Sequence, residues 1–176
     1  MPIYLSVGVE ANGPCPGIYS MIEIGAVVVE PNMNRFYFTQ LEPQDWGRSN
    51  ITYEPEALQA IGRTHEETLL YPDASDSIVE FFTWVQSLDP KEKVVMVSDN
   101  AGFDWQFINY YFHYFCDKNP LGYYARDLTS LYKGLRQDMS ANIDNLRDTE
   151  HTHNALDDAI GNAEVMLKIL HEMGSQ

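Results

Sequence analysis

The sequence predicts a mixed α/β fold, in which one sheet of antiparallel and parallel strands carries helices on both faces. Three early segments, 3–10, 22–30 and 35–42, have the apolar and β-branched composition of strands. Helical and strand patterns then alternate from residue 54 onwards. The chain closes with a helix over about 155–170, whose apolar residues form a single stripe that a sheet can bury.

The first three strands are expected to pair as an antiparallel meander, because the connections between them are short. A segment rich in glycine and proline, Gly13 to Gly17, separates the first two strands, and no regular element can include it. The first strand carries Glu10 at its C-terminal end. Ligands of such sheets bind beyond the strand ends, so Glu10 is a candidate site residue.

The next elements are two helices and a short strand. Helices are predicted over 54–63 and 74–88, the second from apolar residues in helical spacing. Val94 to Ser98 is an apolar run typical of a buried strand in a parallel position. A further short helix is predicted over 127–136.

The helix after the fourth strand begins beside the expected site. Asp99 or Asn100 can cap this helix, so Asp104 lies in its first turn, above the strand end. Asp104 and Glu10 are therefore both expected beyond the ends of strands.

Two neighbouring aspartates begin the closing helix, and capping separates their roles. Asn154 is a good N-cap, and Asp157, three residues later, has the acidic position of a capping box. Asp158 then remains free to reach a metal. His153 lies just before the helix, where an imidazole can take a proton from a water because imidazoles titrate near neutral pH. The alternative is a solvent-exposed histidine beside a capped helix.

Composition favours one domain over residues 1–176, since 44% of the residues are hydrophobic and no long linker or repeat interrupts them. The N-terminus lacks a basic leader and no apolar run is long enough to cross a bilayer, so we expect a cytoplasmic protein without membrane contact. Cys15 and Cys116 have no metal-binding or disulfide spacing.

The net charge of −15 argues against extended, non-specific binding of nucleic acid, which depends on Lys and Arg. The argument weakens where bound divalent cations neutralise clustered carboxylates. Candidate phosphate contacts are Arg63, Arg126, Lys133, Arg136 and Arg147.

The acidic segments resemble those of the DEDDh group of 3′-to-5′ exonucleases, which have a ribonuclease-H-like fold. That group has Asp-x-Glu in its first strand, an Asp opening a central helix, and a His followed five residues later by an Asp. Glu10, Asp104, His153 and Asp158 match this pattern in order. The sequence that flanks these residues is most similar to a small bacterial and phage branch of the group, typified by a mycobacterial exoribonuclease.

The resemblance implies a site for two divalent cations, Mg²⁺ or Mn²⁺. Glu10 and Asp158 would hold the first cation, which orients the attacking water, and Asp104 would act through a metal-bound water. His153 would take the proton, and the second cation would stabilise the 3′-oxygen leaving group. The implied substrate is the 3′ end of single-stranded or overhanging RNA, with DNA as the alternative.

Gly8 stands where the group has an aspartate that bridges both cations. It offers no side-chain oxygen, which especially weakens the second cation site. We favour the interpretation that Gly8 is an inactivating substitution in a chain whose parent is an enzyme. The alternative is a catalytically dead relative that binds nucleic-acid ends or a protein partner, and a small-molecule phosphohydrolase also stays open. Glycine in a strand can instead mark a bulge or a close backbone approach.

Substrate contacts are expected around the cleft. The loop that follows Glu10, together with Met21 and Glu23, is where a 2′-hydroxyl contact would lie. Three aromatic residues near Asp104 can stack on terminal bases, although their helical spacing favours at least two of the three in the core: Phe103, Trp105 and Phe107. The predicted substrate residues are Ala11, Asn12, Gly13, Met21, Glu23, Phe103, Trp105 and Arg126. The aromatic run from Tyr110 to Phe115 exceeds what one helix face buries and favours a homodimer.

Overall fold

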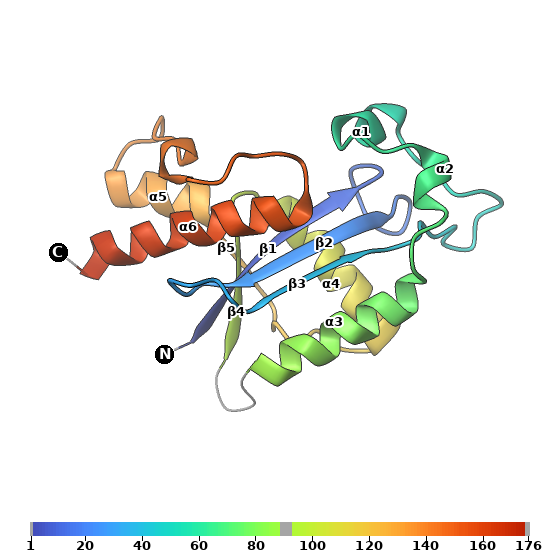
Figure 1. Ribbon diagram of the computed structural model, residues 1–176, viewed down its shortest axis with the longest axis horizontal. Helices are drawn as coiled ribbons and strands as arrows, with labels where there is room; N and C mark the ends of the chain where they lie inside the picture. Colours follow the sequence, from blue (N-terminus) through green and yellow to red (C-terminus); the bar gives the residue numbers. More distant parts are fainter. Residues whose placement is uncertain (1, 89–92, 175–176) are drawn as a thin grey trace.

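The computed structural model describes residues 2–88 and 93–174, which form a five-stranded mixed sheet between two layers of helices (Figure 1). The strand order is β3-β2-β1-β4-β5. The strands are β1 (Ile3–Ala11), β2 (Met21–Val28), β3 (Phe36–Gln40), β4 (Val94–Ser98) and β5 (Arg126–Asp127).

The first three strands form the predicted antiparallel meander, and β4 joins β1 in parallel. The mixed sheet expected from the sequence is therefore confirmed. The two-residue strand β5, which pairs in parallel with β4, was not predicted because two residues carry no detectable pattern.

Six α-helices and a 3₁₀ turn are assigned in the described ranges. They are α1 (Pro55–Ala60), α2 (His65–Thr68), α3 (Ala74–Leu88), α4 (Ala101–Cys116), α5 (Leu128–Arg136), the 3₁₀ turn η1 (Asp144–Leu146) and α6 (Ala155–Gly174). None of these helices is long and apolar enough to cross a membrane.

The helix predicted over 54–63 is shorter in the structure, where α1 ends at Ala60, and a separate helix α2 begins at His65. Gly62 has a left-handed backbone, with φ of 66°, and Thr64 begins α2 with a complete capping box to Glu67. The sequence signal for this break was the Gly62-Arg63-Thr64 segment itself.

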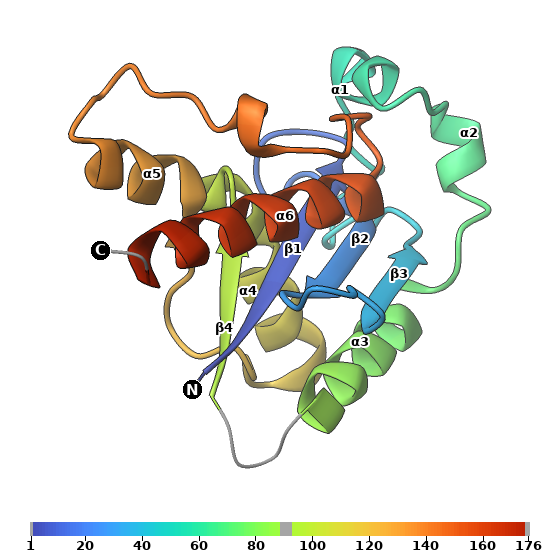
Figure 2. The same cartoon turned by 60° about the vertical axis from the view of Figure 1, so that its left-hand side comes forward.

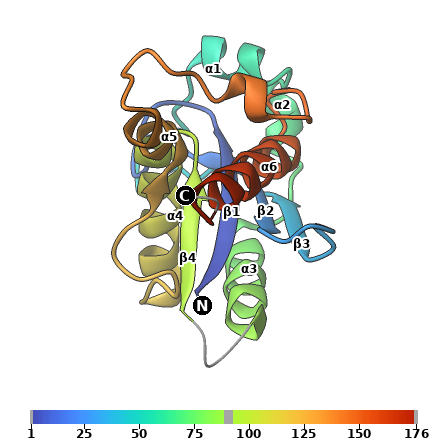
Figure 3. The same ribbon diagram turned by 90° about the vertical axis from the view of Figure 1, so that its left-hand side faces the viewer.

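The two helical layers differ in composition. Helices α3 and α4 cover one face of the sheet with large side chains, among them Phe81, Phe107 and Phe112, which are fully buried. Helix α6 crosses β1 and β2 on the opposite face (Figures 2 and 3). Its buried residues toward the sheet are small, for example Ala159 and Ala163.

A pair of glycines explains why α6 lies so close to the sheet. Gly8 and Gly25 are register partners on β1 and β2. A Cβ atom on Gly25 would overlap the carbonyl oxygen of Ala155, and a Cβ atom on Gly8 would lie 2.7 Å from the same oxygen. The first turn of α6 therefore packs directly on strand backbone, which brings the start of this helix to the C-terminal half of β1.

The N-terminal end of α6 is capped by a side chain. Asn154 caps α6 as predicted, since its Oδ1 accepts hydrogen bonds from Leu156 N (3.0 Å) and Asp157 N (3.2 Å). The Asp157 carboxylate accepts a hydrogen bond from the Thr152 hydroxyl (2.7 Å), whereas a capping box requires one from the backbone N–H of Asn154.

Helix α4 was expected to be capped by Asp99 or Asn100. The Asn100 side chain makes no capping hydrogen bond, and this part of the prediction is wrong. Instead, Ala101 N donates to Asp127 Oδ2 at 3.1 Å. The cap comes from β5, which sequence distance concealed.

The aromatic run on α4 is partly covered within the chain. The Trp46 ring centroid lies 5.2 Å from those of Tyr110, Tyr111 and Tyr114. Tyr114 stays exposed. Part of the aromatic surface that suggested a homodimer therefore packs against Trp46 within the chain. The homodimer stays a prediction.

Candidate active site

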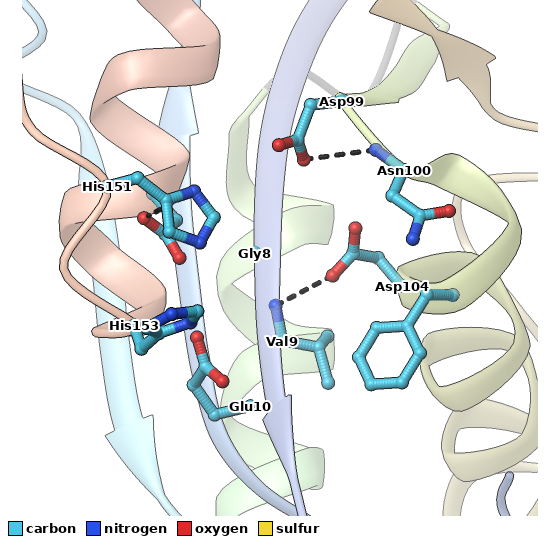
Figure 4. A pocket seen from close by; sticks show the side chains of 10 residues that line it. Gly8, Val9, Glu10, Asp99, Asn100, Asp104, His151 and His153 are labelled. Carbon is cyan, nitrogen blue, oxygen red and sulfur yellow. Dashed lines mark hydrogen bonds and ion pairs between the residues drawn. The ribbon is translucent and has the colours of Figure 1, made fainter. Parts of the chain in front are cut away.

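A pocket of about 360 Å³ lies where β1 and β4 end and α4 and α6 begin (Figure 4). It gathers residues from three widely separated parts of the chain. They are Gly8, Val9, Glu10, Asp99, Asn100, Phe103, Asp104, His151, His153 and Asp158. The four residues that matched the exonuclease pattern, Glu10, Asp104, His153 and Asp158, all line this one pocket.

Glu10 carries an unusual electrostatic load. The pKa of its carboxyl is raised to about 8. Burial is the largest cause, and the negative charges of Asp158, Glu23 and Asp104 add to it. Each charge that acts on Glu10 in this way is negative. A cation near Glu10 would therefore relieve a repulsion that the fold holds in place.

Asp104 is buried and faces the backbone of β1. Its Oδ1 accepts a hydrogen bond from Val9 N at 2.9 Å, and its Oδ2 accepts one from the Ser98 hydroxyl. Burial raises the pKa of Asp104 to about 8, although both hydrogen bonds act to lower it. Asp104 is thus firmly positioned, with both oxygens engaged by the protein.

Asp158 has two cationic or potentially cationic neighbours. Its Oδ1 lies 3.4 Å from Arg147 Nη2 and 3.5 Å from His151 Nδ1. Burial raises the pKa of Asp158, and the charges of His151 and Arg147 oppose that rise.

Arg147 is the centre of a buried network behind Asp158. Its side chain is 6% exposed, and its Nη1 lies 3.5 Å from Asp99 Oδ2 and 3.1 Å from Asn162 Oδ1. A Cβ atom on Gly161 would lie 2.6 Å from Arg147 Nε and Nη2, so a glycine is needed beside the guanidinium. Arg147 Nε has no hydrogen-bond partner among residues 2–88 and 93–174.

The candidate phosphate contacts are largely engaged elsewhere. Arg147 is committed to this network, Arg63 pairs with Glu23 at 2.9 Å, and Arg136 pairs with Glu172 at 2.7 Å. Of the five cations predicted from the sequence, these three are therefore tied to carboxylates in the structure.

Two histidines reach the pocket. His151 and His153 have ring centroids 4.7 Å apart with nearly perpendicular planes. His153 has a left-handed backbone, with φ of 56°, which is uncommon for a residue other than glycine. Figure 4 shows the His153 ring beside Glu10, with Gly8 between His151 on one side and Asp104 on the other.

Asp99 and His151 were missed as site residues. Asp99 was considered only as a helix cap, and His151 was not considered. The signals that point to them are the position of Asp99 directly after a buried strand and the His-Thr-His spacing before α6.

The predicted substrate residues are placed unevenly. Phe103 lines the pocket, while Trp105 is half-buried and packs against the core. Ala11 and Met21 are buried, and Gly13 lies under the ring of Tyr19.

Two polar residues of that set have structural partners. Asn12 is buried, and its Oδ1 accepts a hydrogen bond from Ser20 N at 2.6 Å. Glu23 is buried beneath Arg63, with Oε2 left without a partner. Of the eight substrate residues predicted from the sequence, Phe103 is the one that lines this pocket.

The chemistry of the pocket fits a hard divalent cation between Glu10 and Asp158, because the donors are carboxylates that repel one another. As the side chains stand, no group of three His, Cys, Asp or Glu residues in 2–88 and 93–174 is arranged to enclose an ion. Two facts account for this: Asp104 is turned toward β1, and Gly8 contributes no oxygen.

The fold is similar to that of the ribonuclease-H-like 3′-to-5′ exonucleases of the DEDDh group. Residues 5–170 match the family described as the 3′-5′ exoribonuclease Rv2179c-like domain, and the chain belongs to that family. It is 37% identical to the 3′-5′ DNA exonuclease Cap18 of Escherichia coli over 176 residues, covering 93% of this chain and 89% of that protein.

Solved structures confirm the ribonuclease-H-like fold. The nuclease domain of 3′hExo, a DEDDh family member bound to rAMP, matches with a TM-score of 0.76 and 15% identity over 97% of this chain and 92% of that one. E. coli exonuclease I in complex with a dT13 oligonucleotide matches with a TM-score of 0.72 and 15% identity over 98% of this chain. The match spans only 41% of exonuclease I.

Proposed function

We propose that residues 1–176 form a single metal-dependent exonuclease domain that removes nucleotides from the 3′ end of single-stranded or overhanging RNA, and that Gly8 impairs it. The observation that carries this proposal is the convergence of Glu10, Asp104, His153 and Asp158 on one pocket. RNA is favoured because the family is described as exoribonucleases, and DNA is the second candidate because Cap18 is described as a DNA exonuclease.

The residues of the pocket divide the work of phosphodiester hydrolysis. Glu10 and Asp158 would hold a cation between β1 and α6, and Asp104 would contribute through a water. When bound, two Mg²⁺ or Mn²⁺ ions would stabilise negative charge on the attacking water and on the leaving 3′ oxygen. His153 would take the proton of the attacking water on a ring nitrogen.

The terminal nucleotide would lie against the other wall of the pocket. Phe103 faces this space and offers a ring on which the terminal base can stack. Arg147 holds Asp158 from behind and His151 contacts it from within the pocket, so its orientation is fixed before a substrate arrives.

Gly8 affects the site in two ways. It removes the carboxylate between the two halves of the pocket, and it lets the Ala155 carbonyl approach the strand. A side chain at position 8 meets that oxygen at 2.7 Å, so Gly8→Asp requires the first turn of α6 to move outward by a few tenths of an ångström.

The test is a digestion series on 5′-labelled RNA and DNA single strands with Mg²⁺, with Mn²⁺ and with EDTA. We expect Gly8→Asp to shorten the RNA stepwise from its 3′ end, at least about 100-fold faster than the unmodified chain, because the charge stabilisation supplied by a cation is worth several kcal/mol. Gly8→Ala is the matched control, since it adds the same Cβ without a carboxylate.

The outcome separates the two candidate functions. Folded Gly8→Asp protein that releases nucleotides supports the nuclease. If it releases none, while the unmodified chain still binds single-stranded 3′ ends, the chain is the catalytically dead relative that Gly8 suggests. Release of phosphate from small phosphoesters, without any shortening of oligomers, would identify a phosphohydrolase.

A further inference from the structure

Half of the ten Lys and Arg residues in the described ranges form ion pairs with carboxylates. The ion pairs to carboxylates involve Arg35, Arg63, Arg136, Arg147 and Lys168. Lys93 and Arg126 differ, because neither forms an ion pair with a carboxylate of the described residues. Both instead contact Tyr124.

The geometry around Tyr124 is well defined. Lys93 Nζ donates a hydrogen bond to Tyr124 Oη at 2.9 Å and lies 4.7 Å from the ring centroid. Arg126 Cζ lies 4.7 Å from the same centroid. Tyr124 is 42% exposed and its neighbour Tyr123 is 94% exposed. We call Lys93, Tyr123, Tyr124 and Arg126 the Tyr124 patch.

The patch adjoins the pocket along the β5 edge of the sheet. Arg126 pairs with Val97 and Asp127 with Ser98, directly before the pocket residue Asp99. Lys93 precedes the first residue of β4, so the patch follows the length of this five-residue strand, roughly 13 Å. One end of the patch is therefore close to the pocket and the other lies along the strand away from it.

We propose that the Tyr124 patch binds the nucleotides upstream of the 3′ end, so that a single strand leaves the pocket along the β4–β5 edge. This rests on the proposed exonuclease function. A single-strand path needs cations for the backbone and aromatic rings for the bases, and the patch presents both kinds of group at the surface.

Charge favours a nucleic acid over an acidic protein partner. The pocket that the patch adjoins is itself strongly acidic, through Glu10, Asp99, Asp104 and Asp158. An extended acidic peptide on the patch would meet these carboxylates at one end. A nucleic acid enters the same pocket with divalent cations, which neutralise them.

The experiment measures binding of 3-nucleotide and 12-nucleotide RNA single strands to the chain by fluorescence anisotropy in EDTA, where cleavage does not compete. The variants are Lys93→Gln with Arg126→Gln together, and Tyr124→Leu. Arg35→Gln is the matched control, because it removes one positive charge from the connection between β2 and β3, near the opposite edge of the sheet.

We expect the double variant to bind the 12-mer about tenfold more weakly at low salt, with the trimer much less affected. The slope of log Kd against log salt should fall by about 0.7 for each cation removed, as for phosphate contacts of single strands. Tyr124→Leu should weaken the 12-mer at least about fivefold by loss of stacking, with little change in the slope.

The outcomes distinguish this inference from the proposed function. Equal affinity and salt slope for the double variant and Arg35→Gln, with normal 12-mer binding by the parent chain, would overturn the patch alone. An equal loss for trimer and 12-mer would overturn its upstream placement. No binding of any oligomer, together with no digestion by Gly8→Asp, would remove the exonuclease function itself.

Discussion

At the scale of single residues, Arg147 sets the charge balance behind the pocket. It contacts Asp158 and Asp99 together, and Asn162 supplies a further acceptor. A guanidinium can serve all three partners because its donors are spread over a planar fork, whereas a lysine ammonium is a single point of charge.

Arg147→Met should therefore destabilise the protein. It leaves the largely buried Asp158 without its arginine partner, which costs about 3 kcal/mol when such a pair is broken. Arg136→Met is the control, because Arg136 is half exposed and its partner Glu172 is about one-third exposed, and surface pairs of this kind contribute less than about 1 kcal/mol. Urea unfolding of both variants gives the comparison, and similar losses in the two would contradict the role given to Arg147.

At the scale of elements, the contact of α6 with the glycine pair of β1 and β2 determines the depth of the pocket. The contact is between backbone atoms and has no side chain that can turn aside. Asp158, one turn into α6, is carried to the pocket by this contact.

Gly25→Ala should cost stability, because the added methyl overlaps the Ala155 carbonyl and α6 must shift to admit it. Overpacking of this kind costs about 1–3 kcal/mol. Gly134→Ala on α5 is the matched control, since nothing lies within 4 Å of its added Cβ and alanine favours a helix by up to about 1 kcal/mol. Thermal unfolding should move in opposite directions for the two variants, and a Gly25→Ala protein as stable as the parent would contradict the close contact.

Sequence patterns predicted the elements best where periodicity was strong. The bounds of α3 and β4 were predicted to the residue, because both have clear apolar spacing. The four pattern residues of the pocket were found through motifs. Asp99, His151 and the burial of Arg147 were not, because their roles depend on contacts between residues far apart in the chain.

At the scale of the whole molecule, stability should depend on pH through the pocket. Glu10 and Asp104 have folded pKa values of about 8, above the ordinary values of 4.5 and 3.8. Both therefore bind protons more tightly in the folded state. The stability that this contributes is complete below about pH 4 and is lost as the pH rises through 8.

The metal-free protein should accordingly unfold at a lower temperature at pH 8.5 than at pH 5.5. Scanning calorimetry in EDTA measures this, and Mg²⁺ should raise the unfolding temperature more at the higher pH, where the carboxylates are ionised. Glu10→Gln should flatten the profile. A metal-free unfolding temperature that climbs between these two pH values would show that other groups dominate.

The backbone contact of α6 also couples two positions that no motif connects. The oxygen of Ala155 lies 2.7 Å from the position of a Cβ atom on residue 8, and Asp158 lies on the first turn of the same helix. Restoring an aspartate on the strand would consequently reposition the carboxylate across from it. A displacement of α6 should therefore accompany any change of nuclease rate in the Gly8→Asp variant.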